Sequence, residues 1–218
     1  MERGIVMRNR RLNTALICLC LLLTATLHAT AATLPQSPFA YADLTAGGVP
    51  AGATVEQTVA ILGEPAQRGE ATTEAATGDT LQTLTYEGLT LMYTNGLLTG
   101  ALLTSAAVAG PRGIRLGMDE AALNAAFPYD QNAAKDGVLY AAGWVDALGL
   151  PLPPCAKTMT YDDGTAIVQY LSPVAPYSAE VLASPEAFLY ESHAGLAVTF
   201  GTDKVITALE WHVGALAE

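Results

Sequence analysis

The sequence predicts an α+β fold of two tandem repeats, each a short helix followed by an antiparallel β-meander, with the helices packed on one face of the sheet. Three observations lead to this prediction. Short helical patterns begin with capping residues, alternating runs are separated by turn signals, and the same order of elements occurs twice. We place the first repeat at residues 46–110 and the second at 111–218, after an export signal at 1–31 and a linker at 32–45.

The first 31 residues have the pattern of a secretory signal peptide. Arginines precede the uncharged, leucine-rich stretch 14–27, and Ala29 and Ala31 put small side chains at the two positions that a signal peptidase reads. The apolar stretch is shorter than the roughly 20 residues that a spanning helix needs. We therefore expect cleavage near Ala31, a periplasmic or extracellular location and no stable membrane span. An uncleaved anchor is the alternative.

The expected mature chain is acidic. The signal takes away four of the ten basic residues and one of the 21 acidic residues, which changes the formal net charge from −11 to about −14. Binding to nucleic acid needs clustered Lys and Arg, so nucleic acid is excluded as an expected partner. The acidic loop around residues 64–79 is expected to be a solvated surface, and preference for a basic partner is its functional alternative.

The cysteines predict neither a lipid anchor nor an internal disulfide. Cys18 and Cys20 follow bulky residues instead of the small residue that a lipidated cysteine requires, and both leave with the signal. The mature chain then keeps only Cys155, so its stability has to come from core packing.

The first repeat opens with a helix expected over residues 55–62. Thr54 is the expected N-cap, and Gln57 stands three residues later, as in a capping box. Gly63 and Pro65 then end the helix. Its apolar residues share one face, which needs a sheet to cover it.

Three strands are expected after this helix, at residues 81–86, 89–94 and 97–104. The turn signals Glu87-Gly88 and Asn95-Gly96 join them, and an Asn-Gly pair between alternating runs is the strongest short-range hairpin signal. The region from Gly88 to Pro111 carries no charge and is a second candidate for a membrane span. Its alternating pattern favours strands over a spanning helix.

The second repeat starts at Gly113 and follows the same order. Asp119 takes the place of the first N-cap, and the helix ends at Pro128. Strands are expected again at residues 158–161, 166–171, 195–200 and 205–209. Two insertions, at 129–157 and 172–193, lengthen this copy and contain several prolines, which predicts irregular loops.

The helix motif resembles that of the SmpA/OmlA family of small envelope proteins. The residues that carry the resemblance are Gly52, Thr54, Glu56 and Gln57, followed by Leu62-Gly63 and Pro65. The best known member of this family is the small lipoprotein subunit of the β-barrel assembly machinery. The tandem duplication is similar to the β-lactamase inhibitor protein, whose two helix-plus-sheet repeats form a concave surface that grips an enzyme. The resemblance implies a protein that binds other macromolecules in the cell envelope or outside it.

The sequence contains no catalytic or metal-binding constellation that we favour. A nucleophile hypothesis pairs Cys155 with His193 or His212, with Lys157 nearby to favour a thiolate, whereas a loop cysteine without function is the simpler alternative. Asp162-Asp163-Gly164 fits a hairpin turn, and the spacing of a calcium loop is absent. We therefore predict that the chain is not an enzyme and holds no metal or cofactor.

Aromatic residues are the candidate partner-binding residues. Tyr86, Tyr161 and Trp211 lie on predicted strands, and Trp144 lies on the first insertion. Aromatic side chains anchor interfaces because they bury a large area at small rotamer cost, and packing under the helices is the alternative.

These residues lead to a functional prediction. We expect an exported, non-enzymatic binding module that recognises a protein in the envelope or medium, or another envelope component, through its sheet face and loops. An accessory subunit of an envelope assembly complex and a thiol-dependent enzyme based on Cys155 are the alternatives.

Overall fold

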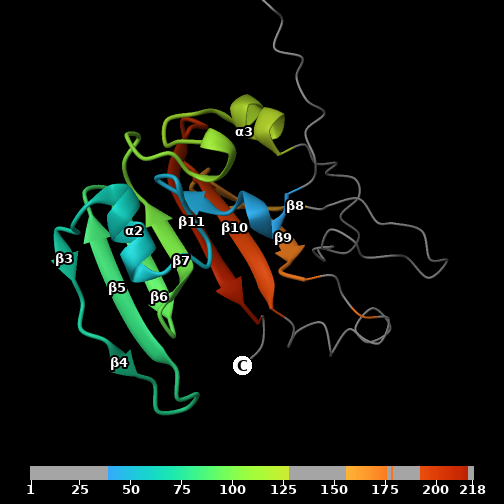
Figure 1. Cartoon of the computed structure of the whole chain (residues 1–218). Coiled ribbons are helices and arrows are strands. Elements are labelled where there is room, and N and C mark those ends of the chain that lie inside the picture. Colours follow the sequence, from blue (N-terminus) through green and yellow to red (C-terminus); the bar gives the residue numbers. More distant parts are fainter. Residues whose placement is uncertain (1–38, 128–155, 176–177, 179–191, 216–218) are drawn as a thin grey trace, which may run out of the picture. The chain divides into compact units, whose positions relative to one another are not determined.

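The computed structural model describes residues 39–127, 156–175, 178 and 192–215 (Figure 1). The predicted export signal lies outside the described residues, as do Trp144, Cys155 and most of both predicted insertions. The first helical or strand element of the described residues begins at Tyr41, and the last ends at Gly214.

The strands of the described residues form two sheets. The small sheet pairs β1 (Thr45–Ala46) with β2 (Val49–Pro50). The large sheet contains β3 (Gln67–Arg68), β4 (Thr72–Thr73), β5 (Thr80–Tyr86), β6 (Leu89–Thr94), β7 (Leu97–Leu103), β8 (Ala156–Thr160), β9 (Ala166–Pro173), β10 (His193–Phe200) and β11 (Ile206–Gly214). The large sheet runs in the order β3-β5-β6-β7-β11-β10-β9-β8, its neighbouring strands are antiparallel, and β4 pairs with β5.

The helical elements of the described part are short. They are the 3-10 helices η1 (Tyr41–Asp43) and η2 (Pro111–Gly113) and the α-helices α2 (Val55–Leu62) and α3 (Glu120–Ala126). No helix within these ranges is both long and apolar enough to cross a membrane. The uncharged region that follows Gly88 forms β6 and β7, as its alternation predicts.

The predicted architecture of two tandem helix-plus-meander repeats is wrong. The described residues form one nine-stranded antiparallel sheet, and the two α-helices are minor elements beside it. The reason is that β7 and β11 pair directly, from Leu103 with Leu209 to Gly100 with His212. In two separate meanders, the backbone N–H and C=O groups along one edge of β7 and of β11 would have no partners, and the direct pairing of the two strands satisfies them. The hydrogen-bonded ladder therefore continues through the middle of the sheet.

Individual elements agree with the sequence pattern better than the architecture does. The expected strands at 81–86, 89–94 and 97–104 are confirmed by β5, β6 and β7, and β9 and β10 include the strands expected at 166–171 and 195–200. Residues 39–45, however, are not a linker. Phe39 and Leu44 are buried in the core, and Trp211 Nε1 donates to the carbonyl oxygen of Thr45 at 3.3 Å.

The start of α2 has the predicted capping box. The Thr54 side chain accepts a hydrogen bond from the backbone N–H of Gln57 at 3.3 Å, and the Gln57 side chain accepts one from the N–H of Thr54 at 2.8 Å. These two bonds satisfy N–H groups that the first helical turn leaves without partners. Gly63 ends the helix with a φ of 81°. The Asp119 side chain caps α3 with a single hydrogen bond, which it accepts from the N–H of Ala122 at 2.8 Å.

The two hairpin turns of the meander depend on glycine for different reasons. Asn95 and Gly96 have φ angles of 53° and 79°, so both occupy the left-handed region that the Asn-Gly signal predicts. Gly88 has a φ of 71° and also lies against Ser105, since a methyl group on Gly88 would come 2.1 Å from Ser105 Cβ. The turn between β5 and β6 is thus held against the segment that follows β7.

The large sheet has a buried face and an opposite face. On β6, Leu89, Leu91 and Tyr93 are buried, and the residues between them point to the other side. The buried face continues with Leu84, Leu98, Leu103, Leu196, Val198, Phe200, Leu209 and Trp211. Figure 1 shows α2 in front of β5 and β6. The Tyr93 hydroxyl donates to Thr58 Oγ1 at 2.6 Å, which ties α2 to the sheet.

One ion pair connects elements that are far apart in the sequence. Arg112 donates from Nε and Nη2 to the two carboxylate oxygens of Asp43 at 2.9 and 2.8 Å, and from Nη1 to the carbonyl oxygen of Ala126 at 2.7 Å. Its guanidinium also lies 4.6 Å from the ring centroid of Phe127. Arg112 therefore joins η1, η2 and the end of α3.

Candidate interaction surfaces

The open face is the side of the large sheet opposite the buried face. Its members follow from the strand register, in which Thr83 pairs with Met92, Met92 with Gly100 and Gly100 with His212. Its side chains are those of Leu81, Thr83, Thr85, Thr90, Met92, Thr94, Leu97, Leu102, Glu210 and His212. Towards β9 and β10 the same side of the sheet has Leu171 and His193, which are both buried. The accessible part is therefore the part formed by β5, β6, β7 and β11.

Three large apolar side chains are exposed at one end of the open face. Leu81, Met92 and Leu97 are 38%, 36% and 47% exposed. Leu81 and Leu97 both pair with Thr94, so the two leucines flank one position of β6. Single exposed apolar residues are ordinary, whereas a cluster of them is typical of an interaction site.

A hollow of about 410 Å³ lies beside this apolar cluster. Met92 lies against Gly100, since a methyl group on that glycine would come 2.8 Å from Met92 Cε. Thr99, at the bulge of β7, forms a hydrogen bond of 2.9 Å with Thr94 between their hydroxyl oxygens, and both residues line the hollow. The hollow thus combines an apolar wall with a rim of hydroxyl groups.

His212 separates two hollows on the open face. It lines the one just described and a smaller one of about 90 Å³ that Gln169, Leu171 and Ala197 also line. The imidazole lies over Gly195, because a methyl group there would come 2.5 Å from Cε1 of the ring. The absence of a side chain at Gly195 gives the exposed histidine a flat surface on which to lie.

The open face carries little charge in an acidic chain. Of the residues that define it, only Glu210 is acidic. The other acidic side chains of the described part lie on η1, on α2, on the segment between α2 and β5, at the start of α3 and in turns: Asp43, Glu56, Glu64, Glu70, Glu74, Asp79, Glu87, Asp119, Glu120, Asp162, Asp163 and Asp203. Depletion of charge is a property of the cores of protein interfaces.

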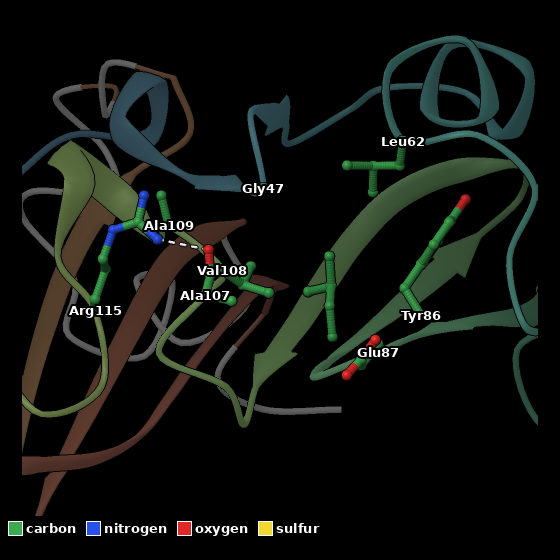
Figure 2. A pocket seen from close by; sticks show the side chains of 9 residues that line it. Gly47, Leu62, Tyr86, Glu87, Ala107, Val108, Ala109 and Arg115 are labelled. Atoms are coloured by element: carbon green, nitrogen blue, oxygen red, sulfur yellow. Dashed lines mark hydrogen bonds between the residues drawn. The ribbon is translucent and has the colours of Figure 1, made fainter.

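A second surface feature, the Tyr86 groove, lies between the end of α2, the β5–β6 turn and the segment after β7. It has a volume of about 350 Å³ and is lined by Gly47, Leu62, Tyr86, Glu87, Leu89, Ala107, Val108, Ala109 and Arg115. Figure 2 shows Arg115 and the residues 107–109 on one side, with Leu62, Tyr86 and Glu87 on the other. Apolar side chains and two opposite charges thus border the same space.

Tyr86 and Arg115 are fixed by hydrogen bonds to backbone carbonyl groups. The Tyr86 hydroxyl donates to the carbonyl oxygen of Gly63 at 3.1 Å. Burial raises the pKa of Tyr86, and the carboxylate of Glu64 adds to this effect. Arg115 donates from Nη1 to the carbonyl oxygens of Ala106 at 3.2 Å and Ala107 at 2.6 Å. Both polar groups are thereby held in place at the groove.

The predicted aromatic residues do not form one site. Tyr86 lines the groove, and Tyr161 is 48% exposed in the turn between β8 and β9. Trp211 is wrong as a candidate partner-binding residue, because its indole lies on the buried face with no exposed area and its Nε1 donates to the carbonyl oxygen of Thr45. Trp144 lies outside the described residues.

The residues of the hollow were missed because their signal is indirect. Once Leu89, Leu91 and Tyr93 are assigned to the core, alternation places Met92 on the opposite face among threonines. An apolar residue on an otherwise polar face is the feature that could have indicated this surface. Leu97 lies on the strand that the predicted Asn95-Gly96 hairpin pairs with β6, whereas His212 becomes a neighbour only through the β7–β11 pairing, which lies outside local pattern reasoning.

The predicted pairing of Cys155 with a histidine lies outside the described residues. His193 is buried and His212 is exposed, while Cys155 lies outside the described ranges. Within those ranges, no three His, Cys, Asp or Glu side chains lie close enough to hold a metal ion. At the predicted Asp-Gly turn, hydrogen bonds from the hydroxyl and N–H of Thr165 lower the pKa of Asp163, which agrees with a turn-stabilising role.

Comparisons with known proteins identify no family. No protein-family model matches the sequence, and no curated protein matches it. A crystal structure of an extracellular protein containing an SCP domain, from Bacillus anthracis strain Ames, is similar over 74% of this chain with 9% sequence identity and a TM-score of 0.37. The chain spans 43% of the length of that protein. A relationship to the SmpA/OmlA proteins or to the β-lactamase inhibitor protein remains a prediction.

Proposed function

We propose that this chain is an exported, non-enzymatic binding module that docks a protein partner on its open face. The observation that carries the proposal is the exposed cluster of Leu81, Met92 and Leu97 beside a hollow, on a face with one acidic residue. Apolar side chains surrounded by hydroxyl groups provide both a desolvated centre and a polar rim, which is the usual anatomy of an interface.

The proposed partner inserts an apolar side chain into the hollow beside Met92. Asp79 and Glu87 flank β5 in the sequence and Glu210 lies on the open face itself, so the rim of the partner should be neutral or basic. A central apolar anchor gives most of the binding energy in such interfaces, and complementary charge at the rim increases the rate of association.

The test compares three forms of the purified protein in affinity capture from envelope and culture-medium fractions. Met92→Glu puts a charge at the centre of the proposed interface, whereas Ile61→Glu puts the same charge on α2, where Ile61 is 51% exposed on another surface. We expect a saturable, stoichiometric partner that the wild type and Ile61→Glu retain and that Met92→Glu loses by at least tenfold. Equal retention by both variants would refute the open face as the binding surface.

The fraction in which the partner occurs distinguishes two versions of this proposal. A partner that stays in the envelope fraction and copurifies in fixed ratio supports an accessory subunit. A secreted enzyme whose activity falls on binding supports an inhibitor.

A further inference from the structure

We infer that the Tyr86 groove binds a short apolar peptide by both of its charged ends, with Arg115 holding the carboxylate and Glu87 holding the amino group. This site is separate from the open face, and the inference does not depend on the function proposed above. It follows from the apolar floor of the groove, its two opposite charges and its size.

The floor of the groove is apolar because three aliphatic side chains converge around Gly47. A methyl group on Gly47 would come 3.2 Å from Leu62 Cδ2, 3.6 Å from Leu89 Cδ2 and 3.8 Å from Val108 Cγ1. Gly47 has a φ of 60°, and its N–H donates to the carbonyl oxygen of Ala109 at 2.8 Å, which fixes the glycine beside the groove. The glycine keeps open a space that any larger residue would partly fill. An aliphatic side chain of a ligand is the group that such surroundings favour.

The charged groups of the groove do not neutralise each other. Arg115 and Glu87 both line it, yet no ion pair among the described residues includes either of them. Arg115 uses Nη1 for two backbone carbonyl groups, so its remaining N–H groups can bind a carboxylate in a fixed orientation. Figure 2 shows Glu87 on the opposite side of the groove, beside Tyr86. A ligand with a negative and a positive end complements this arrangement.

The volume of the groove selects a small ligand. About 350 Å³ lies near the lower end of the roughly 300–1,000 Å³ that small-molecule sites occupy. A dipeptide or tripeptide fits this space, and a free peptide of that length has both charged ends within a few residues of each other.

The experiment titrates the purified protein with leucyl-leucine and follows backbone amide shifts by NMR. Two further probes are N-acetyl-leucyl-leucine, which lacks the amino charge, and leucyl-leucinamide, which lacks the carboxylate. We expect saturable shifts at Gly47, Glu87 and Val108 with the free dipeptide. Loss of either charged end should weaken binding about tenfold, the usual effect of one charge-assisted hydrogen bond.

Glu87→Gln is the central variant, because it removes a charge from an exposed side chain without changing its shape. It should weaken binding of leucyl-leucine about as much as N-acetylation does, and it should leave the affinity for the N-acetylated probe unchanged. Glu56→Gln is the matched control, since Glu56 is also an exposed acid and lies on α2 outside the groove. Arg115→Lys keeps a charge and a donor, and should bind more weakly without loss of the fold.

Two results would overturn the inference. One is the absence of saturable shifts at the groove residues with the free dipeptide. The other is equal affinity for all three probes, which would mean that neither charged end is recognised. Met92→Glu should leave dipeptide binding unchanged, so failure at this groove and failure at the open face can be told apart.

Discussion

Replacement of Gly88 by alanine tests the contact between the β5–β6 turn and the segment after β7. Gly88 and Gly96 have similar φ angles of 71° and 79°, so alanine at either position should cost about 1–2 kcal/mol in backbone strain. At Gly88 the new methyl group would come 2.1 Å from Ser105 Cβ, whereas at Gly96 no atom lies within 4 Å. Overpacking of this kind adds about 1–3 kcal/mol.

We therefore expect Gly88→Ala to lower the free energy of unfolding by about 2–5 kcal/mol, and Gly96→Ala by about 1–2 kcal/mol. Urea denaturation followed by circular dichroism measures both values. Ser105→Gly removes the clashing Cβ, so the double variant with Gly88→Ala should be more stable than Gly88→Ala alone. The recovery should be partial, because the Cα of residue 105 still lies only 3.2 Å from the new methyl group. Equal destabilisation by the two single variants, or no recovery in the double variant, would refute this reasoning.

Three further predictions concern contacts that hold the fold together. Thr54→Ala should cost about 1 kcal/mol through loss of the α2 cap, and Thr54→Ser should be close to wild type in the same denaturation assay. Asp43→Asn leaves the partly buried Arg112 without its ionic partner and should cost about 2–3 kcal/mol, while Glu64→Gln in the exposed pair with Arg68 should change stability much less in thermal melts. Burial raises the pKa of Tyr93, and the hydrogen bond with Thr58 opposes part of this increase. The raised pKa means that the neutral phenol stabilises the fold. This contribution is fully present below the pKa of the unfolded state and is lost as the pH rises through the pKa of the folded state. Tyr93→Phe should thus lose about 1 kcal/mol at neutral pH yet be less sensitive to alkaline unfolding, and a steeper alkaline loss in the variant would contradict this sign.

Local sequence patterns were sufficient for most individual elements. The capping box at Thr54 and the Asn95-Gly96 turn depend on residues close in sequence, and the structure has both where the pattern places them. The alternation of Leu89, Leu91 and Tyr93 likewise identified the buried side of β6.

The architecture depends on pairings that no local pattern encodes. The ladder between β7 and β11 joins residues more than a hundred positions apart in the chain. Trp211 is an example. Alternation along a strand shows which residues share a side with Trp211, but not whether that side is the buried one. The segment around Thr45, which covers the indole, was expected to be a linker. The candidate site was missed for the same reason, since Met92 and His212 meet only across this ladder.

The central position of β11 also constrains the order in which the sheet can form. A chain made from its N-terminus completes β5, β6 and β7 long before Ile206–Gly214 exists. During that interval β7 has an unpaired edge with free N–H and C=O groups, the kind of edge that recruits strands of other molecules. A chain that stops before residue 206 would keep this edge permanently and would also leave β10 without one neighbour. Truncated products should therefore aggregate instead of accumulating as a smaller folded protein.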